Sequence, residues 1–203
     1  IFRQILTDGW QSEKPDDWLP GGGVWLEAQN DKTVDVHFGG DVREFWENGS
    51  HLVEYKNYES VRAVPYDVML PGFDTPEVSR LRLWKAMTPE MDMDLFNAGN
   101  YPDAFRQASM AKAISSILYP NDSHAEGKFL RLKQQYFLVC ASLSDIIWRH
   151  LANYGTLETL PKKVAVHIND THPALAIPEL MRQLLDDCGY GWEKSWNITL
   201  RTF

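Results

Sequence analysis

The polar tetrapeptide NDTH at 169–172 contains the residue types best suited to chemistry in this sequence. It follows a short apolar run at 164–168, and Pro173 directly after it opens a helical pattern. In open α/β sheets, ligands bind beyond the carboxyl ends of the strands, and a helix N-terminus adds free N–H groups and partial positive charge. Asp170 can accept hydrogen bonds from hydroxyl groups, and His172 can donate or accept one near neutral pH. We therefore take Asp170 and His172 as candidate catalytic residues.

A structural interpretation explains the same tetrapeptide equally well on spacing alone. Asn169 and Asp170 could cap the following helix, and His172 could pack beneath it. The exposure of the carboxylate and the imidazole separates the two interpretations.

A second polar segment, PNDSH at 120–124, connects two strongly amphipathic helical patterns. Polar loops on rigid scaffolds often act as gates, and we expect Gly127 to supply a hinge or an unusual backbone dihedral. Spacing alone favours the simpler interpretation, in which Asp122 or Ser123 caps the next helix.

A metal site is not expected. The candidate ligands are Asp122, His124, His167, Asp170 and His172. Their spacing matches no standard ligand motif, and the sequence has no P-loop, nucleophile elbow or CxxC pair.

The elements that must position these residues change in type along the chain. Residues 1–86 are expected to be rich in strands, because apolar and polar residues alternate there and Asn48-Gly49 is a strong hairpin signal. Strands are predicted at 34–38, 42–46, 52–55, 62–66 and 79–86.

The second half predicts helices around one buried strand. Helical spacing runs from Asn100 to Tyr119, from Gly127 to about Asn153, from Pro173 to Gly189, and from Trp192 onward. The β-branched run at 164–168 is typical of a strand buried on both faces and would form a βα unit of a parallel sheet. The fold class is therefore α/β, and we expect 1–203 to form a single domain.

Composition narrows the classes of partner. The net charge of −8 over 203 residues argues against nucleic acid or anionic membranes. No apolar run approaches membrane-spanning length, and the mixed segment 1–14 does not resemble a signal peptide. Cys140 and Cys188 are expected to be buried thiols in a reducing cytosol. Because the sequence begins at Ile1 and ends at Phe203 within a helical pattern, we expect a piece of a longer chain.

Ten segments together resemble the α-glucan phosphorylase family. They are GWQ at 9–11, DDWL at 16–19, VPYD at 64–67, LPGF at 70–73, LRLW at 81–84, LYPND at 118–122, EGK at 126–128, LRLKQQYF at 130–137, NDTHP at 169–173 and LAIPEL at 175–180. Each is modest alone, but the set follows the family's order over essentially the whole chain and is highly specific.

The resemblance implies a GT-B enzyme with two Rossmann-like lobes facing across a cleft, of which this chain is the middle to late part of the N-terminal lobe. The family uses inorganic phosphate to release terminal α-1,4-linked glucose from a glucan as glucose 1-phosphate, with retention. Its pyridoxal phosphate forms a Schiff base with a lysine of the C-terminal lobe, outside this chain. A cytoplasmic homodimer is implied for the parent protein, and the 203-residue piece alone is expected to be inactive.

The resemblance also assigns roles to individual positions. Asp170 and His172 would line the pocket beside the sugar, while Asn121 and Asp122 would lie on the gating loop. Ser123 replaces the asparagine that commonly contacts the glucose 2-hydroxyl, so a hydroxyl would stand in for an amide.

Two further departures concern regulation. Trp148 stands before Arg149 where regulated animal enzymes carry paired arginines, and Asp74 replaces a basic residue seen in many relatives. We expect a microbial-type enzyme without phosphorylation control.

Two alternatives stay open. One is another GT-B lobe that uses a nucleotide sugar, and the other is a non-catalytic glucan-binding module whose tryptophan-rich hairpins form an exposed strip.

Overall fold

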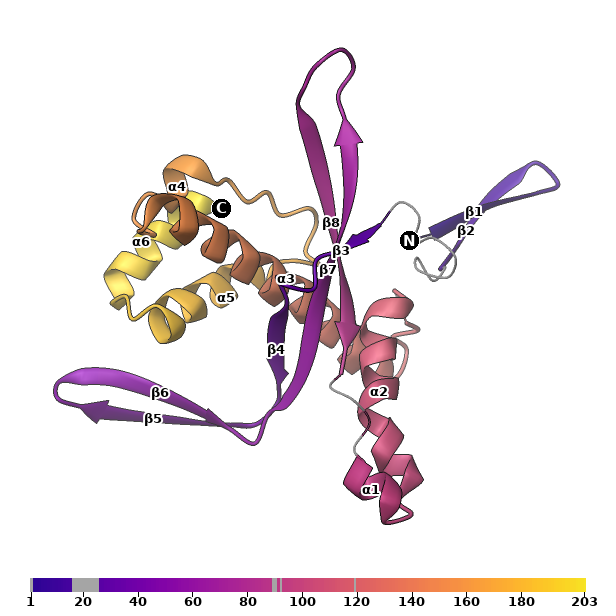
Figure 1. Ribbon diagram of the computed structural model, residues 1–203, viewed down its shortest axis with the longest axis horizontal. Helices are drawn as coiled ribbons and strands as arrows, with labels where there is room; N and C mark the ends of the chain where they lie inside the picture. Colours follow the sequence, from indigo (N-terminus) through magenta and orange to yellow (C-terminus); the bar gives the residue numbers. More distant parts are fainter. Residues whose placement is uncertain (1, 16–25, 89–90, 92, 119) are drawn as a thin grey trace. The chain divides into compact units, whose positions relative to one another are not determined.

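A computed structural model describes residues 2–15, 26–88, 91, 93–118 and 120–203 (Figure 1). The fold is mixed α and β, with strands first and helices after them, as the sequence predicts. Residues 16–19 of the family resemblance and the predicted helix end at Tyr119 lie outside the described residues. Two compact units form: residues 1–35 with 61–134, and residues 36–60 with 135–203.

The first unit is built on antiparallel strands and one long helix. Its elements are β1 (Phe2–Thr7), β2 (Trp10–Pro15), β3 (Glu27–Ala28), β7 (Glu59–Pro71), β8 (Val78–Met87), α1 (Met93–Asn97) and α2 (Tyr101–Ser116), with β7 crossing into the second unit. Strands β1 and β2 form a hairpin, while β7 lies between β3 and β4 (Val34–Phe38) and also pairs with β8. Helix α2 packs along β8.

An ion pair lies inside this sheet. The Asp67 side chain on β7 is fully buried and accepts two hydrogen bonds of 2.8 Å from Arg82 on β8, with Arg80 3.3 Å away. Burial alone would raise the pKa of Asp67, but the hydrogen bonds and charge of Arg82 outweigh burial and hold that pKa below its ordinary value. The carboxylate therefore stays ionised beneath the sheet surface.

The second unit joins a hairpin to a helical core. Its elements are β5 (Asp41–Glu47), β6 (Ser50–Lys56), most of α3 (Ala125–Tyr154), α4 (Leu160–Lys163), α5 (Ala176–Arg182), the π-helical turn η1 (Gln183–Asp187) and α6 (Trp192–Thr202). The β5–β6 turn is Asn48-Gly49, and both residues have positive φ (50° and 79°), as a type I′ turn requires. The hairpin prediction is confirmed.

The core of this unit forms between α3, α4, α5 and α6. Its buried apolar residues are Val139, Leu143, Ile147, Leu157, Leu160, Ala176, Leu180, Leu184 and Ile198. The apolar stripe predicted for α3 is buried at its centre, whereas Phe129 and Leu132 near its start are at least half exposed. Leu151 near the end of the helix is exposed as well, so three apolar residues of the stripe that the sequence predicts are not core residues.

The predicted buried parallel strand at 164–168 is wrong. The backbone is extended at Val164, but the segment pairs with no strand in the described part of the chain. The Val166 N–H donates instead to the Thr202 carbonyl at the end of α6, over 2.8 Å. A β-branched run favours an extended backbone, but a strand also needs a neighbour to complete its ladder.

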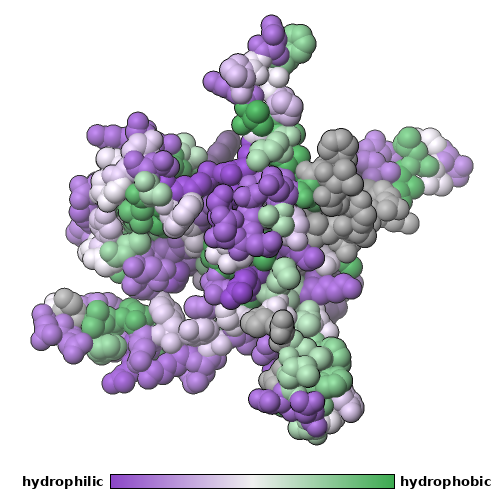
Figure 2. All heavy atoms as spheres, viewed as in Figure 1, coloured by the Kyte–Doolittle hydropathy of each residue, from purple (hydrophilic) through white to green (hydrophobic). Residues whose placement is uncertain are grey.

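Exposed apolar side chains gather over α1 and α2 (Figure 2). Met93, Tyr101, Phe105 and Met110 are all exposed there, although α2 buries Ala104 and Ile114 on its other side. Among the described residues, no helix is long and apolar enough to cross a membrane.

Candidate functional site

The loop at 169–172 places its polar side chains toward solvent. Asp170 has a φ of +62°, in the left-handed region where asparagine and aspartate are the most frequent residues after glycine. Its Oδ1 accepts the Thr171 N–H at 2.7 Å, while the side chain as a whole is 64% exposed. The carboxylate is thus held by its own backbone and remains open to a ligand.

The imidazole of His172 lies beside that carboxylate. Its Nε2 is 3.6 Å from Asp170 Oδ2, and 37% of the side chain is exposed. The structure therefore brings the two candidate residues together, and neither is packed beneath a helix. The capping interpretation does not hold either, because α5 begins only at Ala176 and no side chain caps it at Leu175.

The predicted helix start at Pro173 is displaced by a turn. Residues 172–175 form turns that run into α5, with the Pro173 carbonyl accepting the Ala176 N–H at 2.9 Å. Proline lacks a backbone N–H, so it suits the entry to a helical segment. The loop and helix α5 form one hydrogen-bonded run.

The candidate gate at 121–123 is fastened to the start of α3. Asn121 Oδ1 accepts the Ser123 N–H at 3.0 Å, closing a local turn. Asp122 Oδ2 receives a 2.7 Å hydrogen bond from Arg131 Nη1, two turns into the helix. Asn121, Asp122 and Ser123 are all exposed, as a loop that contacts a ligand would require.

The cap of α3 comes from a residue that sequence reasoning did not choose. His124 Nδ1 accepts the Gly127 N–H at 3.0 Å, whereas the sequence suggested Asp122 or Ser123 for this role. His124 also lies 3.3 Å from Glu126. Imidazole is an uncommon helix cap, which explains why the pattern did not reveal it.

Gly127 permits the close approach of two backbone segments. It lies within the first turn of α3, and its φ is not positive. A Cβ built on it would lie 1.8 Å from the Asn121 carbonyl oxygen. The glycine therefore lets the gate loop contact the helix backbone directly.

The two candidate groups belong to different units of the chain: Asp170 and His172 to the second, and Asn121 to Ser123 to the first. In the described residues, no set of three or more His, Cys, Asp or Glu side chains is arranged to hold a metal.

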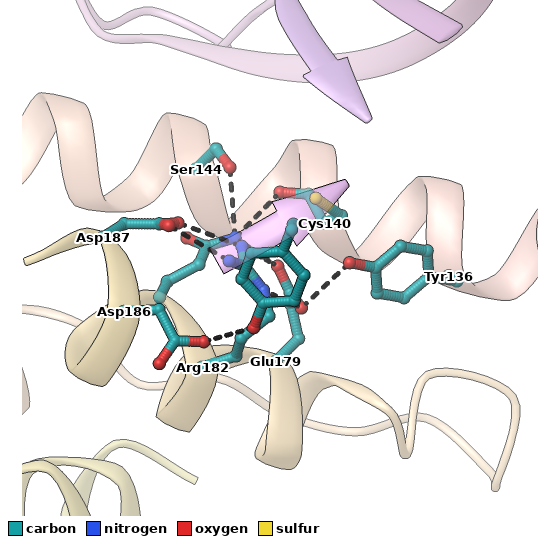
Figure 3. Close-up of polar contacts among 9 residues, drawn as sticks. Tyr136, Cys140, Ser144, Glu179, Arg182, Asp186 and Asp187 are labelled. Atoms are coloured by element: carbon teal, nitrogen blue, oxygen red, sulfur yellow. Dashed lines mark hydrogen bonds and ion pairs between the residues drawn. The ribbon is translucent and has the colours of Figure 1, made fainter. Parts of the chain in front are cut away.

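A buried polar cluster lies in the second unit, around Glu179 and Arg182 of α5 (Figure 3). Its centre is the Glu179 carboxylate, only 3% exposed. Arg182 donates to both carboxylate oxygens at 2.9 Å, Gln183 donates at 2.8 Å, and the Tyr136 hydroxyl donates at 3.2 Å. The acid is thus satisfied by side chains from α3, α5 and η1.

Arg182 links this carboxylate to a second one. Its guanidinium also donates to both oxygens of Asp187, at 3.1 and 3.0 Å. The Tyr55 ring of β6 lies 6.0 Å from the guanidinium carbon, and its hydroxyl donates to Asp186. The buried Glu179 carboxylate and the partly buried Arg182 guanidinium compensate each other through a two-pronged geometry that arginine, but not lysine, can provide.

The electrostatics of the cluster follow from burial and pairing. Burial alone would raise the pKa of Glu179, but the hydrogen bonds and charge of Arg182 lower it below the ordinary value. Burial, and then the Glu179 carboxylate, raise the pKa of the Cys140 thiol to about 12. Burial and the hydrogen bond to Asp186 likewise raise the pKa of Tyr55 to about 12. Glu179 therefore favours its ionised form, and Cys140 favours its protonated thiol form.

Sequence reasoning missed this cluster. The only signal was the spacing on α5, where Arg182 and Gln183 follow Glu179 at i+3 and i+4. Such pairs usually lie on solvated faces, and nothing local indicated that Tyr136 would close the set from 43 residues away.

The chain belongs to the carbohydrate phosphorylase family, whose sequence profile matches residues 1–203. It is 46% identical over 204 residues to a glycogen phosphorylase of Pasteurella multocida, with all of this chain aligned to 24% of that protein. A glycogen phosphorylase of Bacillus subtilis is 46% identical over 202 residues, again with the whole chain aligned to 24% of that protein. The muscle form of Ovis aries is 44% identical over 211 residues, with the whole chain aligned to 25% of it. The chain thus spans about a quarter of the length of these relatives.

Proposed function

We propose that this chain is part of the N-terminal, Rossmann-like lobe of a GT-B α-glucan phosphorylase, in which Asp170 and His172 hold the glucose unit that is transferred. The observation that carries the proposal is the Asp170–His172 pair, 3.6 Å apart, with the carboxylate exposed and the imidazole partly exposed, on a loop that leads into a helix. The relatives named glycogen phosphorylase support the choice of a glucan as substrate.

The proposed reaction transfers a terminal glucosyl group to inorganic phosphate. The bond between glucose C1 and the glycosidic oxygen breaks, and a bond from C1 to a phosphate oxygen forms. A proton passes from phosphate to the departing glycosidic oxygen, which becomes a hydroxyl group of the shortened glucan. Asp170 and His172 contribute by orienting the sugar hydroxyls and by stabilising charge that develops on the ring. The products are glucose 1-phosphate and a glucan one unit shorter.

The cofactor of the proposed enzyme is pyridoxal phosphate, which forms a Schiff base with a lysine. No lysine is buried among the residues whose burial the structure describes, and such a lysine is activated by desolvation or by a neighbouring cation. These residues do not fit a cofactor site, so the proposal places the cofactor in the C-terminal lobe and assigns residues 1–203 no step that involves it.

Asn121, Asp122 and Ser123 form the proposed gate. The Asp122–Arg131 ion pair and the Asn121 turn give this loop a defined resting position, and its exposed side chains can reach a ligand without rearrangement of α3. The remaining parts of the proposal are a cytoplasmic homodimer and, because Trp148 replaces an arginine, the absence of phosphorylation control.

The test uses the full-length enzyme with maltoheptaose and inorganic phosphate, and measures glucose 1-phosphate. Asp170→Asn and His172→Ala should each lower kcat by about 100-fold, because each removes a group aimed at the reacting sugar. Circular dichroism should be unchanged, since both side chains are exposed. Glucosyl transfer from a nucleotide sugar with none from phosphate would favour the other GT-B class, and glucan binding without turnover would favour a binding module.

A further inference from the structure

We propose that Glu179 and Arg182 are positioning residues, which hold the Asp170–His172 loop in its working place by fixing helix α5 against α3. The inference rests on the proposed function of that loop. It concerns the buried Glu179 and the partly buried Arg182, neither of which belongs to the proposed sugar site.

Overlapping backbone hydrogen bonds connect the loop to the part of α5 that carries the buried Glu179 carboxylate. The Ala174 N–H donates to the Thr171 carbonyl at 3.1 Å, and the Ala176 N–H donates to Pro173 at 2.9 Å. The run ends with the Glu179 N–H, which donates to Leu175 at 3.0 Å. Because the hydrogen bonds overlap along the chain, a displacement of α5 carries the loop with it.

Side-chain hydrogen bonds from Tyr136 and Gln183 hold α5 against α3. Tyr136 on α3 donates to Glu179 at 3.2 Å. Gln183, which also donates to Glu179, lies 3.1 Å from the Ser144 hydroxyl and 3.4 Å from the Cys140 carbonyl on the same helix. These contacts fall on successive turns of α3 (Figure 3), so they fix both the rotation and the axial position of α5.

The two carboxylates that pair with Arg182 differ in exposure. Glu179 is 3% exposed and belongs to α5, whereas the Asp187 side chain is 53% exposed and belongs to η1, beyond the arginine. Neutralising Glu179 removes the buried anion that pairs with the partly buried Arg182 guanidinium at the α3–α5 contact, which favours hydration or a shift of α5. Neutralising Asp187 makes the same change of charge where water can compensate.

The experiment compares Glu179→Gln with Asp187→Asn in the full-length enzyme. Glu179→Gln should lower kcat between about 10- and 100-fold, with KM for maltoheptaose changed by less than about threefold, because a misplaced loop impairs the chemical step. Arg182→Lys, which keeps the charge but loses the planar fork, should behave like Glu179→Gln. Asp187→Asn should leave kcat within about twofold.

A double-mutant cycle separates positioning from general loss of structure. In a His172→Ala background, Glu179→Gln should lower kcat by a clearly smaller factor than in the wild type, because one of the two groups that it positions is gone. Amide hydrogen exchange over 169–175 should rise in Glu179→Gln and stay unchanged in Asp187→Asn. If Glu179→Gln does not fold, Tyr136→Phe removes one of the same hydrogen bonds and should give a smaller effect in the same direction.

Three results would overturn the inference. Equal kinetics and exchange for Glu179→Gln and Asp187→Asn would show that the cluster has no specific role. A full effect of Glu179→Gln in the His172→Ala background would show that it acts elsewhere. Both results leave the proposed function standing, whereas no phosphorolysis by the wild-type enzyme removes that function and the inference together.

Discussion

Gly127→Ala is the change whose consequence the structure defines most sharply. The added Cβ would lie 1.8 Å from the carbonyl oxygen and 2.8 Å from the carbonyl carbon of Asn121, and 3.0 Å from His124 Cε1. The nearest atoms are backbone, so no rotamer change relieves the clash. The gate loop or the first turn of α3 must therefore move by about 1.5 Å to restore ordinary contact distances.

The size of the effect follows from what that movement breaks. Overpacking of this kind destabilises a folded arrangement by about 1–3 kcal/mol. A destabilisation of about 1.4 kcal/mol would lower the population of the resting loop tenfold relative to displaced loop conformations. The movement also separates the His124 cap from Gly127 and strains the Asp122–Arg131 ion pair. We expect kcat/KM for maltoheptaose to fall about tenfold in the full-length enzyme, since the competent loop is populated less.

Hydrogen exchange of peptides covering 120–128, measured beside phosphorolysis kinetics, tests this reasoning. Gly191→Ala is the matched control, because a Cβ there meets nothing within 4 Å and the φ of −72° suits any residue. Exchange should rise only in Gly127→Ala. If the two alanine variants give the same exchange and the same kcat/KM, the close approach of Asn121 does not constrain the loop, and the gate assignment loses its structural support.

Three further predictions concern the buried cluster, the thiols and the isolated piece. The Glu179 pKa is lowered in the fold, so its contribution to stability is complete above the ordinary pKa of 4.5 and is lost as pH falls through the folded value. The urea midpoints of wild type and Glu179→Gln should therefore approach each other as the pH falls below 4.5, and a constant gap would contradict the pairing with Arg182. Cys188 is half-buried while Cys140 is buried with a pKa of about 12, so iodoacetamide at pH 8 should label Cys188 first, and equal labelling of folded protein would refute that order. The isolated 203-residue chain should release no glucose 1-phosphate from glucan and phosphate, and measurable release would show that the cofactor lobe is dispensable.

Local signals predicted the elements whose stability is local. Asn48-Gly49 predicted the β5–β6 hairpin because both positions need positive φ. Helical spacing from Gly127 to about Asn153 predicted the long helix α3, which ends at Tyr154, just before Gly155 with its φ of +69°. The prediction of a strand at 164–168 was wrong because the stability of a strand is not local. Its β-branched residues set the backbone, but a strand depends on a partner that is not written into its own sequence.

In the candidate site, too, some residues could be recognised from the sequence, whereas the roles of others depend on the fold. The type and position of Asp170 and His172 were visible because a polar tetrapeptide interrupts an apolar run before a proline. The role of Gly127 was not, because close approach depends on where the Asn121 backbone folds back. Glu179 could not be recognised as buried, since its partners come from α3 and η1 and only the fold brings them together.

The central claim is that the exposed Asp170–His172 pair contacts the transferred glucose. A crystal structure of the full-length enzyme with bound glucose tests it most directly. A sugar hydroxyl within about 3.2 Å of the His172 imidazole or the Asp170 carboxylate is the predicted result. Glucose bound where neither side chain reaches it would contradict the account, whatever activity the enzyme shows.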